Sequence, residues 1–171
     1  MAVITNDIYS PLEAVLPSNN FIKLGADQDV PQLPQEIDVI FDFGGYVDSR
    51  VISALEDSQA VIIPTTANFI DLQVTLNAIK EIERFNSNII IVANRTTKKR
   101  NEDDYKTVQS AISKFFKYPV IEIKELKALP NLFSEKISIS KMVAQGGLKA
   151  YNFKKIANQF NTLINIIKDK I

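Results

Sequence analysis

Short apolar runs alternate with longer segments of helical period along this sequence. Several of the runs are apolar on consecutive residues, which is typical of strands that are covered on both faces. Predicted strands cover residues 2–5, 21–25, 38–43, 60–64, 89–94 and 120–123. This alternation indicates successive strand–helix units.

Two longer segments repeat apolar residues on one helical face, and we expect each helix to bury that face in the core. The first carries Leu72, Leu76, Ile79, Ile82 and Phe85, and the second carries Phe153, Ile156, Ala157, Phe160, Leu163, Ile164 and Ile167. A shorter helix is expected around residues 51–55. Residues 27–35 contain Pro31 and Pro34 and are predicted to form a loop.

These elements predict an α/β fold with a doubly wound, mostly parallel sheet and helices on both faces. Crossovers between parallel strands are right-handed, and such sheets bind ligands at the carboxyl ends of their strands. The chain has 171 residues, of which 46% are hydrophobic. That size and composition predict one α/β domain over residues 1–171.

Composition excludes several kinds of site. Twenty Lys and Arg balance twenty Asp and Glu, so a contact with nucleic acid would need a local basic patch. The sequence has no Cys and no His, which removes disulfides, thiolate metal sites and the usual general base of neutral pH. The start of the chain does not resemble a secretory signal, and no apolar run is long enough to cross a bilayer, so we expect a cytoplasmic protein.

One predicted strand ends in residues suited to phosphate chemistry. The run Asp38-Val-Ile-Phe-Asp42-Phe-Gly44-Gly45 places a carboxylate at the tip of a strand, followed by two glycines that allow a tight turn beside a ligand. A magnesium ion that bridges nucleotide phosphates needs such a carboxylate. The run equally fits a simpler hypothesis, in which Asp42 caps the helix that follows Gly45.

From Asp38 onward, the order of features resembles the ParA/MinD family of deviant P-loop ATPases. The run at 38–45 resembles the strand that carries the family's metal-binding acid. The strand and helix at 60–73 and the strand NIIIVANR at 88–95 follow in the family's order. Upstream, VITND at 3–7 resembles the family's second strand, with Asp7 in place of the second acid of an Asp-x-Asp pair and Thr5 in place of the first. Residues 137–147 resemble the region before the final helix.

The resemblance implies a partition ATPase that handles ATP and magnesium in plasmid or chromosome segregation. It implies that Asp42 holds the metal, that Asp7 helps to position water or metal, and that Asn94, with Arg95, contacts adenine; Gly44 and Gly45 would lie beside the nucleotide. It also implies a homodimer, a ParB-like partner and nonspecific contacts with DNA. We expect self-association in addition, because a family surface that is normally covered would be exposed.

The phosphate-binding loop of the family has no counterpart in this chain. No Gly-Lys-Ser or Gly-Lys-Thr occurs, and the glycines at 25, 44, 45, 146 and 147 cannot form a Walker A loop. We therefore expect weak or no binding of ATP and no hydrolysis by this chain. Two hypotheses remain open: part of a longer ATPase, or a degenerate relative that acts as a non-enzymatic interaction module with the same fold.

Two further motifs allow both a functional and a structural interpretation. The run Lys98-Lys99-Arg100 could contact DNA phosphates, but Glu102, Asp103 and Asp104 follow it and would cancel its charge. Gly146 and Gly147 could let the backbone approach a nucleotide, but they lie between two helical segments and are more typical of a helix end and turn.

Overall fold

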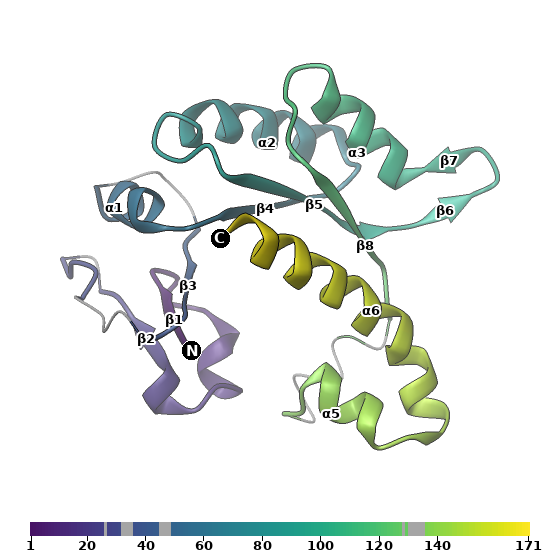
Figure 1. The fold of residues 1–171 in the computed structure, drawn as a ribbon, viewed down its shortest axis with the longest axis horizontal. Coiled ribbons are helices and arrows are strands. Elements are labelled where there is room, and N and C mark those ends of the chain that lie inside the picture. Colours follow the sequence, from purple (N-terminus) through teal and green to yellow (C-terminus); the bar gives the residue numbers. More distant parts are fainter. Residues whose placement is uncertain (26, 32–35, 45–48, 128, 130–135) are drawn as a thin grey trace. The chain divides into compact units, whose positions relative to one another are not determined.

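The computed structural model describes residues 1–25, 27–31, 36–44, 49–127, 129 and 136–171. It is a mixed α/β structure whose two larger sheets are parallel (Figure 1). The chain divides into two compact units, Met1–Asp57 and Ser58–Ile171. Each unit is described by itself.

The first unit contains a three-stranded parallel sheet in the order β2-β1-β3. Its elements are β1 (Ala2–Thr5), η1 (Pro11–Ala14), η2 (Ser18–Asn20), β2 (Phe21–Lys23), β3 (Val39–Asp42) and α1 (Ser49–Asp57). β1 lies in the centre, pairing Val3 with Phe21 on one side and with Ile40 on the other. Its residues Val3, Ile4 and Thr5 are buried, as expected of a central strand.

The second unit contains a three-stranded parallel sheet in the order β4-β5-β8 and a short antiparallel hairpin. Its elements are β4 (Val61–Thr65), α2 (Phe69–Ile82), β5 (Ile89–Thr96), β6 (Lys98–Lys99), β7 (Glu102–Asp103), α3 (Asp104–Ser113), β8 (Val120–Lys124), α5 (Ile139–Ala144) and α6 (Gly147–Lys170). All six strands expected from the sequence are present. The single sheet that we expected is described as two three-stranded sheets, one in each unit.

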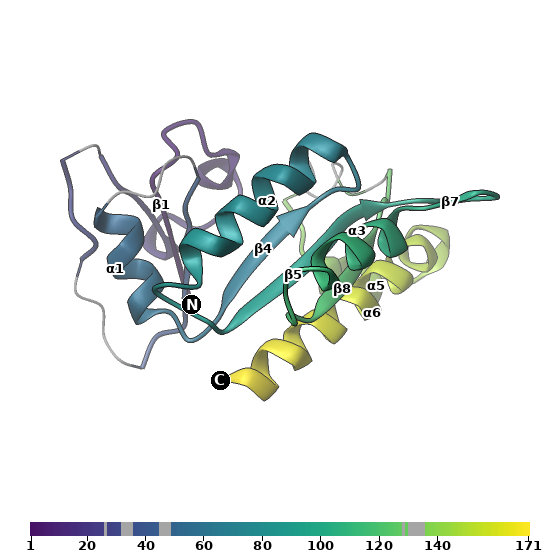
Figure 2. The same cartoon turned by 90° about the horizontal axis from the view of Figure 1, so that it is seen from above.

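The continuous apolar run of β5 is explained by a core on each face of its sheet. Ile89, Ile91 and Ala93 pack with α2 and α3, whereas Ile90 and Val92 pack with α5 and α6. Figure 2 shows α2 and α6 on opposite sides of this sheet. Because successive side chains of a strand point to opposite faces, a strand between two helix layers must be apolar at every position.

The two helical stripes predicted from the sequence are core in large part. Leu72, Leu76 and Ile79 of α2 are buried, as are Phe153, Ile156 and Leu163 of α6. Ile164 is 44% exposed, so its assignment to the buried face was wrong. Leu163 is buried, and the next residue along an α-helix is rotated by about 100°, so the Ile164 side chain points away from the core.

Local side-chain hydrogen bonds fix where the helices of the second unit begin. The side chains of Asn68, Asp103 and Ser138 accept hydrogen bonds from backbone N–H groups at the starts of α2, α3 and α5. Gly146, between α5 and α6, and Gly147, the first residue of α6, adopt φ angles of 74° and 72°. This left-handed conformation, which favours glycine, confirms the interpretation of the pair as a turn between helices.

Candidate functional site

The carboxyl end of the β2-β1-β3 sheet brings together the acidic residues predicted from the sequence. β1 and β3 are parallel neighbours, and Thr5 at the end of β1 is paired with Asp42 at the end of β3. Asp7 follows two residues after Thr5. The first unit therefore places Asp7 and Asp42 at the same edge of one sheet, where parallel α/β sheets bind their ligands.

Thr5 ties the two strand ends together from inside the sheet. Its hydroxyl donates to the carbonyl oxygen of Asp42 at 2.7 Å and accepts from the backbone N–H of Asp7 at 3.1 Å. The side chain is fully buried. A neutral hydroxyl thus holds the backbone of both acidic residues in place.

Asn6 forms a second link between the same strand ends. Its side-chain amide donates to the carbonyl oxygen of Gly44 at 3.2 Å, and its oxygen accepts from the N–H of Gly44 at 3.1 Å. A Cβ atom added at Gly44 would meet no atom within 4 Å. Space is therefore open beside this backbone, and the reciprocal pair fixes its direction. Gly45 lies outside the described residues.

The carboxylates of Asp7 and Asp42 differ in their hydrogen bonds to the rest of the chain. One oxygen of Asp7 accepts from the N–H of Tyr9 at 2.9 Å, which closes a local turn. The Asp42 side chain is exposed and makes no hydrogen bond or ion pair with a described residue. α1 begins at Ser49, so Asp42 does not cap the described part of that helix. Asp42 is thus the freer of the two carboxylates to take a ligand.

Asp7 and Asp42 are the two residues of this edge whose carboxylates could contact a metal ion. Among the described residues no group of three or more acidic side chains is placed to hold a metal ion. Magnesium is usually bound by one or two carboxylates, with water and substrate phosphates completing its shell. Asp42 and Asp7 supply that number of carboxylates.

Asn94 and Arg95 belong to the second unit, at the carboxyl end of β5. The pairing of β5 with β8 shifts between Asn94 and Thr96, and Arg95 at the shift has a φ angle of 56°. Such left-handed backbone is uncommon for a residue with a side chain. Arg95 extends into solvent, with its guanidinium 3.5 Å from Glu125, whereas the Asn94 side chain is half-buried.

The basic run Lys98–Arg100 is largely neutralised by its own hairpin. Lys98 lies 3.5 Å from Asp103, and Lys99 lies 3.3 Å from Glu102 across the β6–β7 pair. A hydrogen bond from the Lys106 N–H lowers the pKa of Asp103, and the nearby Lys98 charge lowers it further. These pairs support the interpretation of the run as a solvated loop.

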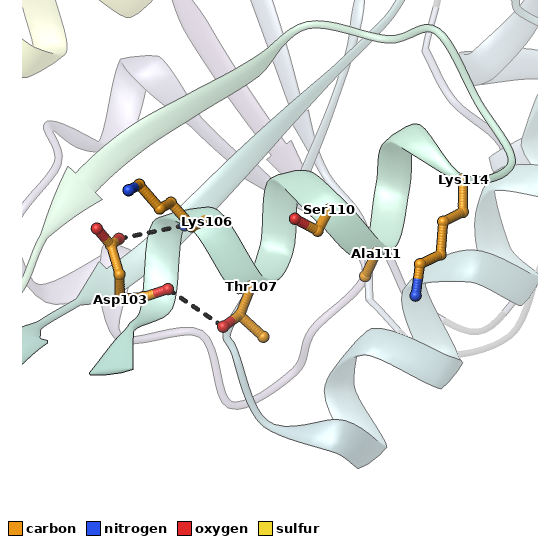
Figure 3. Close-up of a pocket in the computed structure, with 6 residues that line it drawn as sticks. All are labelled: Asp103, Lys106, Thr107, Ser110, Ala111 and Lys114. Carbon is orange, nitrogen blue, oxygen red and sulfur yellow. Dashed lines mark hydrogen bonds between the residues drawn. The ribbon is translucent and has the colours of Figure 1, made fainter. Parts of the chain in front are cut away.

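An open hollow of about 450 Å³ lies along α3 in the second unit. Figure 3 shows its lining residues, which follow one face of this helix from Asp103 to Lys114. The dashed bonds are the helix cap itself, formed by the Lys106 N–H with the Asp103 carboxylate and by the Thr107 hydroxyl with the Asp103 carbonyl. The polar groups there serve the helix rather than converge on a ligand.

Sequence reasoning identified the acids of the first unit but missed Thr5 and Asn6 as the residues that position them. A short polar residue directly after a strand often bonds to neighbouring backbone, and Thr5-Asn6-Asp7 carried that signal.

Comparisons of the chain with models of protein families, with curated proteins and with solved structures found no match. In the part of the chain that the structure describes, no helix is both long enough and apolar enough to cross a membrane. Functional conclusions therefore depend on the site itself.

Proposed function

We propose that this chain is a ParA/MinD-type partition ATPase domain whose metal-binding edge is carried by β1 and β3. The observation that carries the proposal is the placement of Asp7 and Asp42 at one edge of a parallel sheet, with Thr5 bridging their backbones. Asp42 would hold magnesium, and Asp7 would orient a bound water or the metal. The resemblance supplies the biological role, which is the segregation of plasmid or chromosomal DNA.

The resemblance also concerns the adenine and the phosphates of the nucleotide. The adenine contacts that the resemblance implies for Asn94 and Arg95 concern the second unit alone and are a separate proposal. No Gly-Lys-Ser or Gly-Lys-Thr is present to surround the phosphates, so the residues of this chain do not fit the phosphate groups of ATP. We expect the chain by itself not to hydrolyse ATP.

A second candidate function is a non-enzymatic interaction module of the same fold. It is favoured by the missing phosphate loop and by the engagement of one Asp7 oxygen with the Tyr9 N–H. An acid that is used to close a turn is less available to position water.

A fusion experiment separates the two candidates. The strand, phosphate loop and helix of a partition ATPase would be joined to the start of this chain, and phosphate release and ATP·Mg binding would be measured. The ATPase proposal expects the chain alone to be inactive and the fusion to hydrolyse ATP. An Asp42→Asn variant of the fusion should lose this activity by a factor of about 100 or more, because the metal stabilises the transferring phosphoryl group.

The matched control is Asp38→Asn, which removes the same charge at the opposite end of the strand. Asp38 is exposed, and its backbone carbonyl, which accepts from the Ala2 N–H, is unchanged by the substitution. It should leave activity within about twofold of the unmodified fusion. A folded fusion without turnover, or equal turnover with Asn at position 42, would refute the metal role and favour the interaction module.

A further inference from the structure

The net charge of this protein is zero, but its two units carry opposite net charges. Residues 1–57 contain ten acidic and two basic side chains, and residues 58–171 contain ten acidic and eighteen basic ones. The formal charges are therefore −8 and +8. A segregation of this size creates two surfaces of strong and opposite potential.

Positive charge is concentrated on the α5–α6 helical pair. Residues 136–168 contain six lysines and no Asp or Glu. Lys141 of α5 and Lys154 and Lys155 of α6 are exposed, and none of their ammonium groups forms an ion pair with a described residue. Figure 1 shows that α5 packs beside the start of α6, at the end farther from the C-terminus. We call these three residues the basic face.

Negative charge is concentrated in the connection between β2 and β3. Residues 25–38 contain Asp27, Asp29, Glu36 and Asp38 and no Lys or Arg. All four side chains are exposed, and none is ion-paired within the described part of the chain. We call these four residues the acidic loop.

We propose that the basic face of one molecule docks on the acidic loop of a second molecule, in a head-to-tail contact. Each copy carries both surfaces, so the partner of complementary charge is always present at the same concentration. A nucleic acid or an anionic membrane would satisfy the basic face alone and would be repelled by the −8 unit of the same chain. These observations favour a second copy over either polyanion.

The contact is heterologous, since two different surfaces meet. Each docked molecule keeps one basic face or acidic loop free, and the contact therefore repeats to give open chains or closed rings rather than a symmetric dimer. It depends on exposed charges, so salt weakens it: the screening length falls from about 10 Å at 0.1 M to about 3 Å at 1 M salt.

Sedimentation equilibrium over a concentration series tests the proposal. At low salt the average mass should rise with concentration, and at about 1 M salt the association constant should fall by at least about tenfold. The double variant Lys154→Gln/Lys155→Gln and the double variant Asp27→Asn/Asp29→Asn should each lose self-association by a similar factor. The matched control Lys106→Gln/Lys114→Gln removes two exposed charges, one on α3 and one on the residue that follows it, and should associate like the unmodified chain.

Mixing the two defective variants gives the most specific test. One retains the acidic loop and the other retains the basic face, so the mixture should form a 1:1 complex and stop there, because the second pair of surfaces has lost charge. Circular dichroism would confirm that both variants are folded. A monomer at every concentration at low salt, equal association of both variants and the unmodified chain, or a mixture without a 1:1 complex would each overturn the proposal. Binding of duplex DNA or anionic vesicles by the unmodified chain, with no self-association at low salt, would also overturn it.

Discussion

Replacing Ile79 by alanine should destabilise the second unit strongly. Ile79 lies on α2 with no solvent-exposed surface, in the core formed with Ile63, Ile89 and Val108. The substitution removes three buried carbon groups, which is worth about 2.4 kcal/mol at roughly 0.8 kcal/mol for each. Incomplete collapse of the resulting cavity adds to that loss, so we expect a total of about 2.5–4.5 kcal/mol.

Val74→Ala is the matched control because it shortens an apolar side chain on the same helix. Val74 is 63% exposed, so the change should alter the free energy of unfolding by less than about 0.5 kcal/mol, and the higher helix propensity of alanine offsets part of that. Urea unfolding followed by circular dichroism measures both values. Equal midpoints for Ile79→Ala and the unmodified chain, or equal losses in the two variants, would refute the assignment of α2's inner face to the core.

Three further predictions concern a helix cap and two titrating groups. Asn68→Ala should cost about 1 kcal/mol in urea unfolding, because it removes the side-chain acceptor of the Ile70 N–H at the start of α2, and Asn68→Ser should retain most of that stability. Asp103 has a lowered pKa, so its contribution to stability is present above its unfolded pKa and is lost as pH falls through the folded value. Asp103→Asn, which keeps a capping side chain, should therefore flatten the acid limb of a stability-against-pH curve, and an unchanged limb would contradict this. Burial, together with the neighbouring Glu83, raises the pKa of Tyr118, so its contribution is present below its unfolded pKa and is lost as pH rises through the folded value. Tyr118→Phe should reduce the loss of stability at alkaline pH, and an ultraviolet titration of the tyrosinate should show one late-titrating group that this variant lacks.

The sequence predicted the strands well because each has a local signature. All six predicted strands appear, and the bounds of β1 coincide with the prediction at Ala2–Thr5. The run Ile89-Ile90-Ile91-Val92 is apolar on both faces, which is possible only for a strand between two helix layers. The turn at Gly146-Gly147 was equally local, since glycine readily adopts positive φ.

Elements without a strong apolar period were missed or misjudged. The two strands of the β6–β7 hairpin consist of four charged residues, and their pairing is visible only as cross-strand contacts of Lys98 with Asp103 and of Lys99 with Glu102. α3 was not predicted, because only Val108 and Ile112 of its ten residues are buried. Ile164 was predicted to be buried from its helical spacing, but it lies at the edge of the apolar face of α6 and is 44% exposed.

Strand order and charge distribution were decided by tertiary structure. The sequence determined that Asp7 and Asp42 follow apolar strands, but only the parallel pairing of β1 with β3 places them at one edge, because a strand's neighbours are chosen by long-range contacts. The sequence likewise shows twenty charges of each sign. Their division into an acidic and a basic unit became clear only when the structure placed the unit boundary after Asp57. The order of residues determines local features such as strands, turns and helix caps. Which distant residues come into contact depends on which apolar surfaces are buried against one another.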